Sequence, residues 1–135
     1  MRPHWHILGA GSIGLLWGYY LAKAGCAVSI ISRHEKSAFR QRITLVKLDK
    51  TVSESINVVP SDEVTHIQHL LIATKTWQTE AALNSIRAKI LPQAQVVLMQ
   101  NGMGNQQTLA ELLPECAVYA ASCSEGALRT DRYAV

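Results

Sequence analysis

Three glycines near the start of the chain have a spacing that could bind a phosphate group. Gly9, Gly11 and Gly14 follow the spacing G-x-G-x-x-G, between a short apolar run and a pattern typical of a helix. A pyrophosphate needs several free backbone N–H groups at close range, and a side chain at Gly9 or Gly11 would obstruct its approach. Gly14 would let the helix pack tightly on the strand, while the helix N-terminus, which carries about half a positive charge, faces the phosphates. The residues predicted to contact this ligand are Gly9, Ala10, Gly11, Ser12, Ile13 and Gly14; the alternative is a strand-to-helix turn without a ligand.

Arg33 indicates which dinucleotide the glycine bend would take. It follows the second apolar run, at the point where NAD-binding domains place an Asp or Glu for the ribose 2′-OH and NADP-binding domains need a cation for the 2′-phosphate. A guanidinium is a planar fork suited to phosphate, and Lys36 is close behind. This predicts NADP(H) as the cofactor. Two alternatives stay open: Arg33 only solvates a surface turn, or the strand ends two residues later and Glu35 takes the ribose.

Two later strand ends carry polar residues. Lys75 follows the apolar run 70–74, and Asn101, between two glycines, follows the run 95–100. Open α/β sheets bind their ligands at the carboxyl ends of the strands, so both residues are candidates for the same site. Lys75 could reach cofactor phosphates or a substrate carboxylate, or could simply be solvated. Asn101 could meet a closely approaching ligand, or belong to a plain Asn-Gly turn.

The elements that must position these residues alternate between strands and helices. The patterns predict strands at 4–8, 27–32, 70–74, 95–100 and 116–122, helices at 12–24, about 78–89 and 105–113, and an antiparallel pair between Ile43 and Val59. Such alternation is typical of an α/β, Rossmann-type, doubly wound fold with a mostly parallel sheet and flanking helices. With 135 residues, one domain over 1–135 is expected.

Composition excludes several classes of function. The chain is 48% hydrophobic and 17% charged with a net charge of +3, and its Lys and Arg residues are scattered, so no nucleic-acid partner is expected. Gly9 and Gly11 interrupt the first apolar run, and no run reaches the ~20 residues of a membrane span, so we expect no membrane partner. The odd count of three cysteines, without C-x-x-C spacing, favours a reducing, cytoplasmic setting. His66 and His69 lack a third ligand at suitable spacing, so no metal is predicted.

Four motifs together resemble the ketopantoate reductase (2-dehydropantoate 2-reductase) family. They are Gly9-Ala10-Gly11-Ser12-Ile13-Gly14, Arg33, Thr74-Lys75-Thr76-Trp77-Gln78 and Gln100-Asn101-Gly102-Met103-Gly104. The Lys-x-Trp-Gln and Asn-Gly-Met-Gly elements, in that order, are far more specific than the glycines. The resemblance spans nearly the whole chain, but only the N-terminal, cofactor-binding half of the family's architecture. It therefore implies that the family's helical second domain is absent from residues 1–135.

The resemblance also implies an activity and residue roles. The family uses NADPH to reduce the ketone of 2-dehydropantoate to (R)-pantoate, a step toward pantothenate and coenzyme A. Carried over by position, the glycine bend would hold the pyrophosphate, Arg33 the 2′-phosphate, and Lys75 would stand near the cofactor, while Asn101 would sit where nicotinamide ribose and substrate meet. Ala127, in the looser match Ser122-Cys123-Ser124-Glu125-Gly126-Ala127, would offer a backbone contact to the cofactor.

One part of the family's machinery has no counterpart here. The family's proton-donating lysine belongs to the second domain, so the resemblance implies that this chain holds no catalytic residue. It also implies that the chain alone is inactive on its 2-keto acid substrate. The alternatives are a stand-alone NADP-binding or sensor module, and a Rossmann reductase of another 2-keto acid. A homodimer through the face that the missing domain leaves uncovered is a further expectation.

Overall fold

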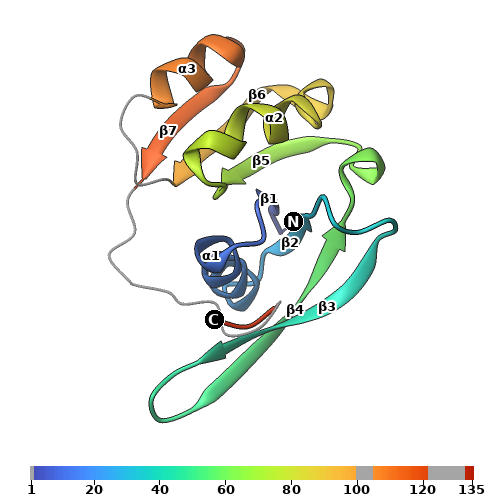
Figure 1. Ribbon diagram of the computed structural model, residues 1–135, viewed down its shortest axis with the longest axis vertical. Coiled ribbons are helices and arrows are strands. Elements are labelled where there is room, and N and C mark those ends of the chain that lie inside the picture. The colour runs from blue at the N-terminus through green and yellow to red at the C-terminus, as the bar shows by residue number, and fades with distance from the viewer. Residues whose placement is uncertain (1, 100–104, 122–132) are drawn as a thin grey trace.

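The structure is a computed structural model that describes residues 2–99, 105–121 and 133–135. Its centre is a seven-stranded sheet in the order β3-β4-β2-β1-β5-β6-β7 (Figure 1). The strands are β1 (His4–Leu8), β2 (Ala27–Ile31), β3 (Phe39–Val46), β4 (Thr51–Val59), β5 (Ile67–Ile72), β6 (Ile90–Met99) and β7 (Ala117–Ala121). The helices are α1 (Ser12–Lys23), α2 (Thr79–Asn84) and α3 (Asn105–Leu112). Among these strands of the described residues, β3 and β4 are the only antiparallel pair, so the predicted Rossmann-type, mostly parallel sheet is confirmed.

Two apolar cores cover the two faces of this sheet. Ile7 and Leu8 are successive residues of β1, so their side chains point to opposite faces. Ile7 belongs to a buried cluster with Leu15 and Tyr19 of α1, and Leu8 belongs to one with Leu109 of α3. The second cluster also takes Leu83 at the end of α2. Helices therefore flank both faces, with α1 against β1 and β2 (Figure 1).

The antiparallel pair predicted between Ile43 and Val59 is confirmed, and it begins earlier. Strands β3 and β4 pair from Phe39 opposite Val58 to Val46 opposite Thr51. Side chains alternate as the period of a strand requires: Ile43 is fully buried, while Arg42 beside it is exposed. The hairpin extends from the body of the domain (Figure 1).

The single helix expected from about Gln78 to Lys89 is wrong. The segment divides into a 3₁₀ turn at Thr76–Gln78, the short α2, and a second 3₁₀ turn at Arg87–Lys89. The Ser85 hydroxyl donates to the carbonyl of Ala82 at 2.6 Å, a local bond of the kind that competes with helix continuation. Strand β6 then begins at Ile90, so Pro92 lies inside a strand.

Pro92 is tolerated there because the ladder between β5 and β6 is irregular. Ile67 pairs with Ile90, but His69 pairs with Gln95, so the register shifts between them. Gln93, inside the shift, has a φ of 66°, in the left-handed region that few non-glycine residues adopt. A proline cannot donate to a ladder, and irregular stretches of strand accept it.

The last described residues return to the edge of the sheet. Thr44 of β3 donates its N–H to the carbonyl of Tyr133 and accepts from the N–H of Val135, both at 3.0 Å. Val135 is 6% exposed and joins the cluster under α1. Figure 1 shows this terminus lying beside β3. Among the residues that the structure describes, no helix is long and apolar enough to span a membrane.

A buried histidine lies in the central strand. His6 is 6% exposed, stacks on His4 with ring centroids 4.3 Å apart, and has no hydrogen-bond partner for Nδ1 among the described residues. Burial lowers the pKa of His6 to about 4, with a smaller contribution from the charge of His4. Burial also lowers the pKa of His4.

We predict that His6 makes the fold sensitive to mild acid. The folded pKa lies below the unfolded value of 6.5, so stability is complete above pH 6.5 and falls as the pH drops towards 4, because the unfolded chain takes up the proton first. Between pH 7.5 and pH 5 this loss amounts to at most about 2 kcal/mol. Urea unfolding at both pH values should show a smaller loss in His6→Leu than in the unmodified chain; equal losses would contradict the prediction.

Candidate functional site

The glycine bend joins β1 to α1 and passes close to the end of β5. Gly9 has a φ of 109°, and a Cβ there would lie 3.0 Å from the carbonyl of Ala73 and from the nitrogen of Thr74. The N–H of Ala73 donates to the carbonyl of Leu8 at 2.9 Å, so the two strand ends are tied together. Gly9 is therefore required by the backbone on the other side of the bend, a role that the sequence pattern did not indicate.

Gly14 brings the helix onto the bend. A Cβ on Gly14 would lie 2.2 Å from the carbonyl oxygen of Gly9 and 3.4 Å from Cγ2 of Ile7. Neither the carbonyl nor the strand can move by that much without disturbing the sheet. The close helix-to-strand packing expected at this glycine is therefore present in the structure.

Gly11, in contrast, faces open space. No atom lies within 4 Å of the position that its Cβ would take. It is the N-cap of α1 and supplies no side-chain cap, and the first turn of α1 has no acidic residue. The first N–H groups of a helix have no partner within the helix, so here they lack side-chain caps and carry the positive end of the helix dipole. An anionic group fits this position without any rearrangement of the bend.

A cleft of about 560 Å³ opens beside the bend. The carboxyl ends of β1, β2 and β5 meet around it, as expected for parallel strands. Of the predicted site residues, those that line it are Gly9, Ala10, Gly11, Arg33 and Lys75. Ser12, Ile13 and Gly14 form the first turn of α1 and do not line it, and Asn101 and Ala127 lie outside the described residues.

At the end of β2, two long hydrogen bonds join neighbouring residues beside the cleft. The N–H of His34 donates to the Ser32 hydroxyl at 3.3 Å, and Nε of Arg33 donates to Nε2 of His34 at 3.4 Å. Arg33 is exposed, and within the described part of the chain no carboxylate forms an ion pair with it. Its guanidinium therefore keeps N–H donors for a ligand in the cleft.

At the end of β5, a turn presents Lys75 on the opposite wall. The carbonyl of Lys75 accepts from the N–H of Gln78 at 2.8 Å and from the Thr79 hydroxyl at 3.2 Å. The hydroxyls of Thr74 and Thr79 lie 2.9 Å apart. Lys75 itself is exposed, and Trp77, 76% exposed, stands at the rim. This local network holds the backbone of the turn while the lysine stays available to a ligand.

Several lining residues have no signal in the sequence as site residues. They are Ser32, His34, Ser61, Ala81, Ala82, Ser85 and Tyr133. Three of them, Ala81, Ala82 and Ser85, belong to α2 and its C-cap, so their position depends on how α2 packs. Tyr133 comes from the far end of the chain, and its hydroxyl donates to Oε1 of Glu35 at 3.2 Å. Only the return of the chain to β3 brings it there.

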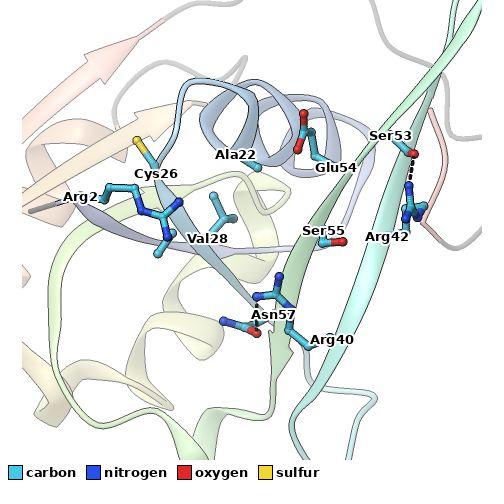
Figure 2. A pocket seen from close by; sticks show the side chains of 11 residues that line it. Arg2, Ala22, Cys26, Val28, Arg40, Arg42, Ser53, Glu54, Ser55 and Asn57 are labelled. Carbon is cyan, nitrogen blue, oxygen red and sulfur yellow. Dashed lines mark hydrogen bonds between the residues drawn. The ribbon is translucent and has the colours of Figure 1, made fainter.

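A second hollow of about 410 Å³ lies between the N-terminal end of β2 and the hairpin. Figure 2 shows that its arginines do not converge: Arg2 lies on one side of Val28, and Arg42 donates to Ser53 on the far side. Arg40 donates to Asn57 at 3.2 Å. The guanidiniums therefore offer no common anion site, and the cleft beside the glycine bend is the better candidate. No three His, Cys, Asp or Glu side chains gather as metal ligands in the described ranges.

The fold and the bend together define a doubly wound α/β domain of the Rossmann type. Comparison with known families makes this specific, because residues 5–135 match the family described as "Ketopantoate reductase PanE/ApbA". The chain belongs to the ketopantoate reductase family. It is 34% identical over 123 residues to the 2-dehydropantoate 2-reductase of Vibrio cholerae, covering 91% of this chain and 40% of that protein. With the enzyme of Pyrococcus horikoshii it shares 32% identity, covering 79% of this chain and 36% of that protein.

Solved structures share the fold. A probable 2-dehydropantoate 2-reductase from Bacillus subtilis superposes with a TM-score of 0.81 at 23% identity, covering 97% of this chain and 45% of that one. A D-mandelate dehydrogenase solved with NADH and anilino(oxo)acetate also gives 0.81, at 20% identity, covering 97% of this chain and 44% of that one. The chain thus spans less than half the length of these relatives.

We predict that two of the glycines separate binding from folding. Gly11→Ala should change the free energy of unfolding by less than about 1 kcal/mol, because its methyl group meets open space. The same methyl group should abolish NADPH binding, because it stands where the pyrophosphate would approach. Gly14→Ala should cost about 3 kcal/mol or more, because its Cβ would overlap the Gly9 carbonyl.

The measurements are urea unfolding and fluorescence titration on both variants. A Gly11→Ala chain that binds NADPH normally would contradict the role of the bend. A Gly14→Ala chain as stable as the parent would contradict the packing.

Proposed function

We propose that this chain is the NADPH-binding domain of a 2-dehydropantoate 2-reductase. The observation that carries the proposal is the cleft itself, where the uncapped N-terminus of α1 and the exposed cations Arg33 and Lys75 surround one space. Positive groups at three points suit a ligand with several phosphates. The two curated relatives at 34% and 32% identity, both named 2-dehydropantoate 2-reductase, supply the substrate.

The residues present fit the cofactor. Backbone N–H groups at Gly11 and in the first turn of α1 would hold the pyrophosphate, and the guanidinium of Arg33 would hold the 2′-phosphate. Lys75, on the opposite wall, would stand beside the phosphates or the nicotinamide ribose. Following the family resemblance, Asn101 would sit where the nicotinamide ribose and the substrate meet, and the backbone of Ala127 would contact the cofactor. The bound cofactor supplies a hydride to the ketone carbon of the substrate.

The second chemical requirement is a proton for the developing alkoxide. A positioned acid must supply it within hydrogen-bond reach of the reacting oxygen. We assign Lys75 no such role, because the family resemblance puts it beside the cofactor phosphates. We infer that these 135 residues bind the cofactor and do not turn over the substrate by themselves.

A second candidate is the reduction of a different 2-keto acid. It is favoured by the D-mandelate dehydrogenase structure, which has the same TM-score as the Bacillus subtilis reductase. That protein was solved with NADH, whereas Arg33 favours a cofactor with a 2′-phosphate here.

Self-association of this chain stays a prediction. A relative from Staphylococcus aureus is described as dimeric.

We predict that Arg33 selects NADPH over NADH. The unmodified chain should bind NADPH in the micromolar range, about 8 kcal/mol of binding free energy. Arg33→Ala should weaken NADPH on the order of tenfold to a hundredfold, the value of a hydrogen bond to a charged group, and leave NADH unchanged. Fluorescence titration measures both, with Arg42→Ala as the matched control because Arg42 lies at the other hollow. Equal affinity of the unmodified chain for the two cofactors would overturn the assignment.

We also predict that the chain shows no NADPH oxidation above background with 2-dehydropantoate. The physical reason is that our proposal assigns no proton donor to these residues, so saturating both ligands should not help. The assay is absorbance at the nicotinamide band with a curated relative, such as the Vibrio cholerae enzyme, as the positive control. Measurable turnover by the 135 residues would show that a residue of this chain donates the proton.

A further inference from the structure

We propose that Tyr133 is a positioning residue for cofactor selectivity: its hydroxyl holds the Glu35 carboxylate outside the cleft, so that the end of β2 offers Arg33 alone to the ribose. The inference rests on the proposed function, since it concerns how the same cleft distinguishes NADPH from NADH.

The sequence places two opposite signals two residues apart. Arg33 favours a 2′-phosphate, and Glu35 is the type of residue that accepts hydrogen bonds from a free ribose 2′-OH. A carboxylate in the cleft would also repel a 2′-phosphate, which carries negative charge. Selectivity therefore depends on where the Glu35 carboxylate lies, and not on Arg33 alone.

The structure places that carboxylate behind a tyrosine. The hydroxyl of Tyr133 donates to Oε1 of Glu35 at 3.2 Å, joining residues 98 positions apart in the chain. Tyr133 lines the cleft together with Arg33 and His34, whereas Glu35 does not line it. Tyr133 is thus part of the wall of the cleft, and its hydroxyl holds the Glu35 carboxylate.

The tyrosine is itself held on two sides. Its ring packs edge-on against Phe39, with centroids 6.3 Å apart and planes at 79°. Its carbonyl accepts the N–H of Thr44 at 3.0 Å, which fixes the backbone against β3. A ring held by these contacts keeps its position when only the hydroxyl is removed. Removal of the hydroxyl therefore changes the constraint on Glu35 without changing the wall.

The experiment is a double-mutant cycle on the 135-residue chain. NADPH and NADH are titrated against the unmodified chain, Tyr133→Phe, Glu35→Gln and the double variant. Tyr133→Phe should lower the preference for NADPH by about fivefold to tenfold, the size typical of one hydrogen bond, by weakening NADPH and strengthening NADH. In the Glu35→Gln background the same change should have no effect, because a neutral amide does not repel phosphate.

Tyr119→Phe is the matched control, because Tyr119 is an exposed tyrosine on β7 that does not line the cleft. It should leave the preference unchanged. A role of Tyr133 in stability alone would weaken both cofactors equally and would not depend on the charge of Glu35.

The outcomes separate this inference from the proposed function. If the unmodified chain binds neither dinucleotide, the proposed function and this inference both fail. If it prefers NADPH, and Tyr133→Phe keeps that preference or loses it equally in the Glu35→Gln background, only the role of Tyr133 is overturned.

Discussion

The contact between Gly14 and the carbonyl of Gly9 is the constraint on which the rest of the domain depends. A single methyl group would not fit there, so the first turn of α1 lies directly on the bend that follows β1. This contact fixes both the packing of α1 on the sheet and the position of its N-terminus. The helix buries Leu15, Leu16 and Tyr19 against the sheet, and its N-cap residue Gly11 lines the cleft. Stability and the candidate site therefore arise from one packing contact.

The strand order explains why the cleft lies where it does. From β1 the chain moves first to β2 on one side and later to β5 on the other, so the order reverses between β1 and β5. Loops that leave in opposite directions cannot cover the same edge, and a crevice remains. Gly9 stands at this reversal, against Ala73 and Thr74. Its missing side chain lets the two strand ends approach while the crevice opens above them.

Features that depend on residues close in sequence could be predicted, whereas features that depend on contacts between distant residues could not. The G-x-G-x-x-G spacing, the β-branched hairpin and the cations at the ends of β2 and β5 each depend on residues close in sequence, and all were predictable. The division of 78–89 into two 3₁₀ turns and the short α2 was not predicted, and neither was the start of β6 at Ile90, which pairs with Ile67 on a neighbouring strand. The burial of His6 follows from strands on both sides of β1, and Tyr133 reaches Glu35 only through its pairing with Thr44.

The distribution of charge in the cleft suits phosphate binding better than proton transfer. Arg33 and Lys75 lie on opposite walls, and the helix N-terminus lies between them at the bend. A bound phosphate would stabilise each of these positive groups, and an ammonium paired with a phosphate holds its proton more tightly. A group that donates a proton in the reaction needs the opposite tuning, towards a lower pKa. The features that would make the cleft a good phosphate site therefore make its own cations poor acids, so binding and proton donation are best supplied by different parts of such an enzyme.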